Sequence, residues 1–278
     1  MNKYFDLKRF GRYFVYDLHN LRANYGLSMV LLACMPVVLY VVTVLFNVLT
    51  HGIFGSWGGW VSPSFGVRIA VFFIALMVLT ISFPVKQYGA LTEKRYGSDW
   101  LMIPASRLEK FTSMLLLTLV VVPLVFLCMY NLTDWILSLC DPTYGQAMVT
   151  LRMNEIMYGS SVVDMPVTLG GGGLWILWSM IAESMLIFLL GAVCFKRKKV
   201  PMTFLCLFAF SMAMSAILSL VVYHFSGSIE TWAESIDPER LQNMNWHFRI
   251  NFYLWMRMVV ILGGLGAAIW FRLKTLKH

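Results

Sequence analysis

Long apolar runs separated by short polar segments dominate the pattern along this chain. Six runs approach or exceed the roughly 20 residues that an α-helix needs to cross a bilayer. Most of the charged residues fall between the runs, not within them. We therefore predict an all-α, polytopic membrane protein with six transmembrane helices. The expected spans are residues 27–49, 68–85, 111–139, 174–195, 200–224 and 251–271.

Residues 1–26 form a segment that is too polar to span but strongly amphipathic. A basic helix with an aromatic stripe is typical of segments that lie in the headgroup plane, where anionic lipid attracts them. We predict such an interfacial helix here, followed by a single transmembrane domain over residues 27–278. The alternative is a soluble helix that packs on the cytoplasmic surface of the protein. The apolar stripe consists of Leu7, Phe10, Phe14, Leu18, Leu21 and Tyr25.

Composition and charge agree with this interpretation. Apolar residues make up 59% of the chain and charged residues only 13%, against about a quarter in soluble proteins. Of the 22 Lys and Arg residues, 17 fall in the terminal and loop segments that are cytoplasmic if the N-terminus is inside. The positive-inside rule then predicts that both termini are cytoplasmic. The basic residues that give the net charge of +8 thus cluster at the ends of spans, and we expect no nucleic-acid partner.

Motifs for catalysis are missing from the sequence. It contains no GxxxxGK[ST], HExxH or GxSxG pattern, and its five cysteines show no metal-ligand spacing. We therefore expect no catalytic, metal or cofactor site in this chain, and no enzymatic activity of the chain alone. An intramembrane enzyme acting on lipid is a remaining hypothesis, which the absence of these constellations disfavours.

The most specific polar segment is the loop over residues 84–110, PVKQYGALTEKRYGSDWLMIPASRLEK. It carries five basic residues and lies between two expected spans. Ser106 and Glu109 have the spacing of a capping box, which predicts that the third helix begins there. Pro104 disfavours helix in the residue before it. Local helix capping alone accounts for these three residues without any partner.

The order of features in this loop resembles the loop between the second and third helices of type-2 ABC exporter permeases. In that family a small residue precedes an apolar stretch, then Pro-small-Ser-Arg, then Lys as the third helix begins. Gly97, residues 101–103, residues 104–107 and Lys110 follow this order. The segment PASRLEKF is similar to the corresponding segment of small permeases of the Bacteroidota. Six helices, a cytoplasmic N-terminus and an amphipathic N-terminal helix also agree with the family.

The resemblance implies a permease subunit in the bacterial cytoplasmic membrane that couples a separate ABC ATPase to export. ATP would bind that ATPase, and two permease chains, identical or sisters, would enclose the path. The outer loop 141–173 is longer than the family usually has. The alternative is an accessory or regulatory membrane protein that keeps this fold and moves nothing. The residues implied to couple to the ATPase are Gly97, Asp99, Trp100, Met102, Pro104, Ser106 and Arg107.

A few residues inside the expected spans stand out. Glu183 lies near the middle of the fourth span, where an ionised carboxylate is costly, and Arg257 in the sixth span is a possible partner. The alternatives are a contact in the export path, a structural pair, or a neutral, hydrogen-bonded Glu183. Pro123 predicts a kink in the third helix. A face of small residues in the sixth span predicts close helix packing, within the chain or between two chains; we favour the first. It comprises Gly263, Gly264, Ala267 and Ala268.

Overall fold

The computed structural model of the chain describes residues 5–54, 63–92, 100, 102–141, 144, 172–234 and 246–275. Over these residues it is all-helical, as predicted, and includes one short 3₁₀ helix (η1) and one π-helical turn (η2). The elements are α1 (Leu7–Ala33), α2 (Met35–Phe54), α3 (Phe65–Tyr88), η1 (Gly89–Thr92), α5 (Arg107–Leu116), η2 (Leu117–Val121), α6 (Val122–Cys140), α8 (Gly172–Cys194), α9 (Lys199–Glu234) and α11 (Trp246–Thr275).

Several helices are long and apolar enough to cross a membrane. Among the described residues there are four, covering Phe65–Thr92, Arg107–Cys140, Lys199–His224 and Trp255–Thr275, and a fifth if the bent pair α1–α2 counts as one span. The described apolar part of α8, Trp178–Cys194, is shorter. The chain is therefore a helical protein with four to five potential spans, while the sixth span and the sidedness stay predictions.

Helix α1 continues beyond the amphipathic segment of residues 1–26 into the expected first span, as far as Ala33, and the break lies at Cys34. The axis bends there by 41°. Pro36 in the first turn of α2 explains the position, because it has no backbone N–H to donate to the preceding turn. The buried side of α1 also differs from the predicted stripe. Leu7 is 77% exposed, and the buried residues are Tyr13, Asp17, Leu21, Tyr25, Met29, Leu32 and Ala33.

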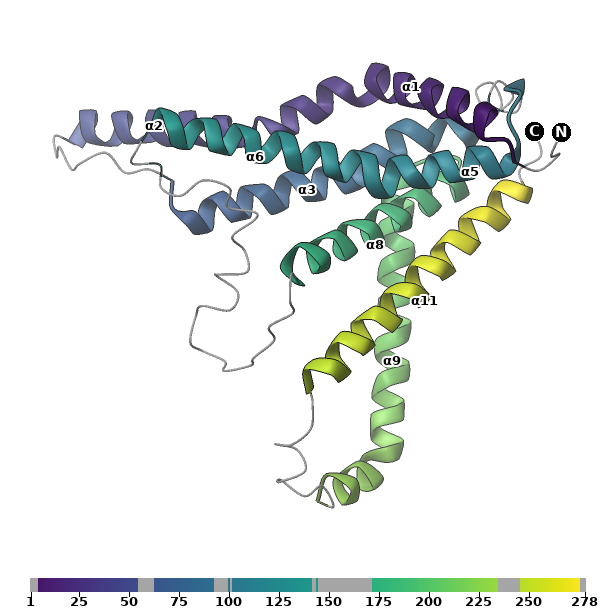
Figure 1. Cartoon of the computed structure of the whole chain (residues 1–278). Coiled ribbons are helices and arrows are strands. Elements are labelled where there is room, and N and C mark those ends of the chain that lie inside the picture. The colour runs from purple at the N-terminus through teal and green to yellow at the C-terminus, as the bar shows by residue number, and fades with distance from the viewer. Residues whose placement is uncertain are drawn as a thin grey trace.

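Three long helical rods lie side by side in the main body: α1–α2, α3, and the continuous rod α5–η2–α6 (Figure 1). Helix α8 packs against α3 and α11. Both chain ends lie near the start of α5, at the right of Figure 1. We call this the loop end of the molecule, because α3 ends there and α1 and α5 begin there.

The core lies where the rods meet α8. Phe72 of α3 packs against Phe126 and Tyr130 of α6, with ring centroids 6.3 and 5.0 Å apart. Met185 and Leu189 of α8 are fully buried in the same cluster. Large apolar side chains therefore hold the rods together over most of their length, because burying them removes extensive apolar surface and gains dispersion contacts.

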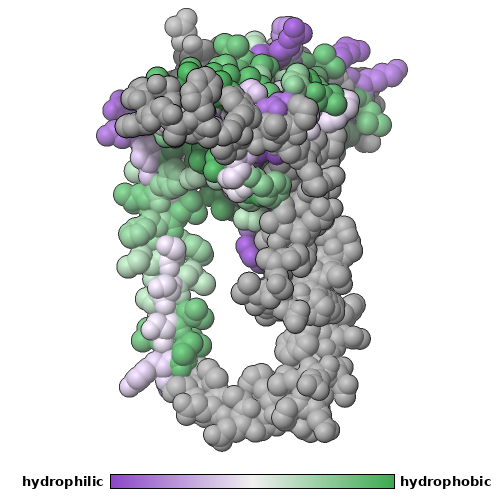
Figure 2. Space-filling view, turned by 90° about the vertical axis from the view of Figure 1, so that its left-hand side faces the viewer, coloured by the Kyte–Doolittle hydropathy of each residue, from purple (hydrophilic) through white to green (hydrophobic). Residues whose placement is uncertain are grey.

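Helix α9 extends away from this body (Figure 1). None of its most apolar stretch is buried inside the chain, and Figure 2 shows it as a column of predominantly hydrophobic residues. Exposed side chains on it include Phe208, Phe210 and Leu220. An apolar helix without protein cover is stable in lipid, where such side chains carry no solvation cost.

The predicted irregularity at Pro123 takes the form of the π turn η2, which immediately precedes α6. A proline cannot donate to the carbonyl four residues earlier, here that of Leu119. The indole Nε1 of Trp178 in α8 donates to this Leu119 oxygen at 3.0 Å. The freed acceptor is thus satisfied by a neighbouring helix, which also ties α8 to the third rod.

Candidate functional site

The loop between α3 and α5 is described at residues 89–92, 100 and 102–106. Gly97 and Asp99, two of the residues implied to couple to an ATPase, lie outside the described residues. The others, Trp100, Met102, Pro104, Ser106 and Arg107, lie within them. The site is therefore built from the second half of the loop and the helix that follows it.

The start of α5 is the predicted capping box. The backbone N–H of Glu109 donates to Ser106 Oγ at 3.2 Å, and the backbone N–H of Ser106 donates to Glu109 Oε2 at 2.8 Å. Helix α5 begins at Arg107 as a result. The prediction of a helix start at this position is confirmed.

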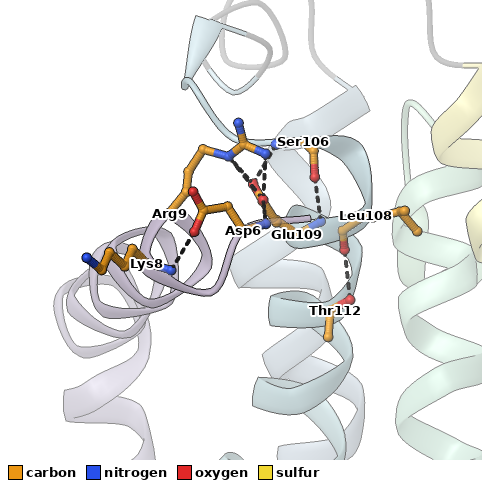
Figure 3. A network of polar contacts seen from close by, with 7 residues as sticks. All are labelled: Asp6, Lys8, Arg9, Ser106, Leu108, Glu109 and Thr112. Atoms are coloured by element: carbon orange, nitrogen blue, oxygen red, sulfur yellow. Dashed lines mark hydrogen bonds and ion pairs between the residues drawn. The ribbon is translucent and has the colours of Figure 1, made fainter. Parts of the chain in front are cut away.

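The carboxylate of Glu109 has a second role that the sequence did not reveal. Its side chain is fully buried, and Arg9 of α1 donates to it through Nε at 2.8 Å and Nη2 at 2.7 Å. The backbone N–H of Asp6 adds a bond of 2.9 Å. Figure 3 shows that the bonds from Arg9 and Asp6 and those of the capping box meet at Glu109. One carboxylate thus joins the N-terminus of α1 to the cap of α5.

A second carboxylate, Asp17, joins three helices a little further along α1. It is only 5% exposed and accepts hydrogen bonds from Ser113 Oγ at 2.9 Å, Tyr88 Oη at 3.3 Å and Gln87 Nε2 at 3.4 Å. The donors come from α5 and from the end of α3. The only sequence signal was an acidic residue on an otherwise basic helix, which does not predict its partners.

Trp100 is turned inward and held at three points. Its indole Nε1 donates to Tyr13 Oη at 3.1 Å, its carbonyl accepts from Lys110 Nζ at 2.6 Å, and the Lys110 ammonium lies 4.6 Å from the ring centroid. Such a cation–π contact adds to the attachment. The resemblance implies that Trp100 contacts a partner; in this structure its ring is half-buried against α1 and α5, and a contact with a partner stays a prediction.

The side chain of Met102 is exposed, in contrast to that of Trp100. It is 80% exposed, two residues after a firmly held tryptophan. Pro104 and Arg107 are also exposed, and Arg107 Nη1 donates to the carbonyl of Lys274 near the C-terminus at 3.3 Å. The described loop therefore presents an apolar tip and a guanidinium on a base that is fastened to α1 and α5.

The loop end also gathers basic side chains from distant parts of the chain. Lys199 donates to the carbonyl of Gly89 at 2.5 Å, and Arg272 Nε donates to that of Val193 at 3.4 Å. Together with Lys86 in the last turn of α3 and Lys110 in the first turn of α5, these residues place cations from four helices at the loop end.

Glu183 and Arg257 are brought together. Arg257 Nη2 lies 3.0 Å from Glu183 Oε2, and the two side chains are 49% and 18% exposed respectively. The pairing anticipated as one alternative is therefore present, between α8 and α11.

The small-residue face of α11 is open. A Cβ added at Gly263 or Gly264 meets no atom of the described chain within 4 Å, and Ala267 is exposed. In the part that the structure describes, the close packing within the chain that we favoured is not formed at Gly263, Gly264 and Ala267, while Ala268 is half-buried. Helix α11 joins the core through other residues: Ile269 and Leu273 belong to it, and Leu262 and Leu265 pack against it.

A buried ion pair lies at the end of the rods opposite the loop. Arg68 Nη2 donates to both Asp134 oxygens at 2.8 and 2.9 Å, and each side chain is less than 5% exposed. Tyr144 Oη donates to Asp134 at 3.0 Å, and the Arg68 guanidinium lies 4.0 Å from the Tyr144 ring centroid. The sequence places Arg68 and Asp134 near outer span ends and predicts interfacial positions, which stays a prediction; the structure shows their side chains buried against each other.

Comparison with protein-family models, curated proteins and solved structures gives no match for this chain. The class of protein follows from the fold itself. It is a helical, membrane-embedded protein, because several of its helices are long and apolar enough to span a bilayer and one of them has its apolar surface exposed.

Proposed function

We propose that the chain is the membrane-spanning permease subunit of a type-2 ABC exporter in the bacterial cytoplasmic membrane. It would couple a separate ATPase, which binds ATP, to export of a substrate, and would pair with a second copy or a sister permease. The chain would have six spans and both termini in the cytoplasm. The Gly-apolar-PASR-Lys order in the loop and the charge asymmetry of the sequence support this proposal.

One structural observation carries the proposal: an exposed apolar tip stands on a rigidly fastened base. Met102 has no cover, while Trp100 before it and Ser106 after it are bonded to their neighbours. A transmission element needs this combination, because a force applied to the tip must reach the membrane helices without being absorbed by the loop. Through Tyr13 and Glu109, movement of this loop would reach both α1 and α5.

The basic loop end suits the same role. Arg107, five residues after Met102, is also exposed, and cations of α3, α9 and α11 lie at this end of the molecule. A cytoplasmic partner would meet an apolar contact flanked by positive charge, which is the arrangement of a small anchor with a polar rim.

The test is site-specific photocrosslinking from the loop tip in cells. A photoreactive phenylalanine analogue replaces Met102, and the matched control places it at Leu7, an equally exposed apolar position at the same end of the molecule. We expect an ATPase subunit to be captured from position 102 and not from position 7. Capture from neither position, or equally from both, contradicts the coupling role.

A variant that places a charge at the loop tip tests how much Met102 contributes to the affinity for the ATPase. Met102→Asp should weaken association with the ATPase by about thirtyfold if this side chain is a central anchor worth about 2 kcal/mol. Intact association together with absent ATP-dependent transport would favour the accessory-protein alternative. Lipid turnover by the purified chain alone would favour an enzyme.

A further inference from the structure

A groove of about 360 Å³ lies between the first and third rods. Its volume is within the range of small-molecule sites, which is roughly 300–1,000 Å³. The α1 side contributes His19 and Arg22, and no carboxylate lines the groove. The remaining wall is apolar, with Val15, Leu18 and Met29 on one side and Val121, Val122 and Val125 on the other.

The depth of Arg22 can be read from the contacts of α1. Asp17 accepts a hydrogen bond from Tyr88, and Tyr25 is hydrogen-bonded to Ser82. Arg22 lies between these two contacts along α1. It therefore stands level with the stretch of α3 that contains Lys86, the charged residue at which the apolar run of α3 ends.

The apolar end of the groove lies on the membrane side of this level. Ser113 bonds to Asp17, and Val121 and Val125 follow it by 8 and 12 residues. At 1.5 Å per residue they lie about 12 and 18 Å further along the rod, toward the apolar part of α3. Along α1 the groove thus runs from Val15 past His19 and Arg22, at the level where the apolar run of α3 ends, to Met29 in the apolar zone.

Both basic side chains of the groove are available to a ligand. Arg22 and His19 are exposed, and neither forms an ion pair within the described residues. The opposite wall lies at the π turn η2 and the start of α6. π turns recur at functional sites, because they displace side chains from the regular helical pattern.

We propose that this groove binds one anionic phospholipid. Its phosphate would be held by Arg22 and His19, and one acyl chain would lie along Met29, Val121 and Val125. Cationic side chains at the level where the apolar run ends match a headgroup phosphate, and an apolar channel beginning at that level matches the chain attached to it. The inference depends only on membrane embedding, and it holds whether or not the chain binds an ATPase.

The experiment measures lipid retention by the delipidated full-length protein in detergent, using native mass spectrometry. The probes are phosphatidylglycerol and phosphatidylcholine with identical acyl chains. We expect Arg22→Gln to weaken phosphatidylglycerol binding about fivefold, the effect of one surface cation on an anionic lipid, and to leave phosphatidylcholine binding unchanged. Arg12→Gln, an exposed basic position of α1 outside the groove, is the matched control and should change neither.

The acyl-chain half of the proposal has its own variant. Val125→Trp fills the groove and should reduce binding of both lipids, while soluble glycerol phosphate should not compete. Size-exclusion chromatography verifies that each variant is folded, and Val125→Phe replaces the tryptophan variant if that one aggregates. Equal effects of Arg22→Gln and Arg12→Gln, unchanged binding in the groove-filling variant, or competition by glycerol phosphate would each overturn the proposal.

Discussion

Removing Asp134 should destabilise the protein far more than removing a comparable acid nearby. In Asp134→Ala the Arg68 guanidinium stays in place, only 4% exposed, and loses the carboxylate that accepts two of its hydrogen bonds. Tyr144 loses the acceptor of its hydroxyl in the same step. A buried cation that loses this carboxylate retains its desolvation cost and loses the attraction of the pair that helped to offset it.

The expected loss in unfolding free energy is about 3–5 kcal/mol, the usual effect of removing one partner from a buried ion pair. The pair itself is worth much less, since forming it requires both charges to be desolvated. Replacing both members by apolar residues, Arg68→Met with Asp134→Leu, should therefore recover most of the loss. The double change removes the uncompensated charge and fills the space with side chains suited to a helical core.

Reversible unfolding in mixed micelles, followed by intrinsic tryptophan fluorescence, measures the free energies. Asp141→Ala is the matched control at the same end of the third rod. Asp141 is less buried and accepts a hydrogen bond from Tyr40 at 3.0 Å, so its loss should cost about 1 kcal/mol. Equal losses from the two alanine variants would refute the reasoning. A double variant whose loss equals the sum of the single losses would show that the residues are not coupled.

Two further predictions concern helix packing and use the same unfolding measurement. Trp178→Phe should cost about 1 kcal/mol, because the part-buried Leu119 carbonyl loses its donor. Adding Pro123→Ala should reduce the loss by restoring a backbone N–H, and an unchanged loss in the double variant would contradict this account. Gly191→Ala should cost about 1–3 kcal/mol by overpacking, since a Cβ there would clash with Thr203 Oγ1. Adding Thr203→Ala should partly recover this loss. The control, Gly263→Ala, has open space around it and should be neutral or slightly stabilising. A similar loss at both glycines would refute the steric argument.

Local signals predicted the features that depend on neighbouring residues in the chain. The capping box at Ser106 and Glu109 needs only three residues of separation, and the structure has the helix start there. Pro123 was expected to disturb its helix, and the π turn lies directly before it. The end of α1 at Ala33 was not predicted, because the boundary at residue 26 marks a change in polarity and not a change in backbone conformation.

Local sequence signals did not predict the contacts of the candidate site, which join distant parts of the chain. Nothing in the sequence relates Arg9 to Glu109, which are 100 residues apart, or joins Asp17 to Ser113. The resemblance implied a partner contact for Trp100 but not its contacts with Tyr13 and Lys110 in its own chain. Met102, two residues later, is the side chain left exposed.

The sequence alone determined that this is an all-helical, membrane-embedded protein, because lipid imposes length and polarity on each helix separately. Helix starts and proline effects follow from the sequence for the same local reason. Only the tertiary structure decided which polar residues meet: Arg9 with Glu109, Asp17 with Ser113 and Arg68 with Asp134. Such pairs depend on the rotation and depth of one helix against another. The apolar side chains that set this packing are largely interchangeable in sequence, so they leave no pattern that identifies the polar partners.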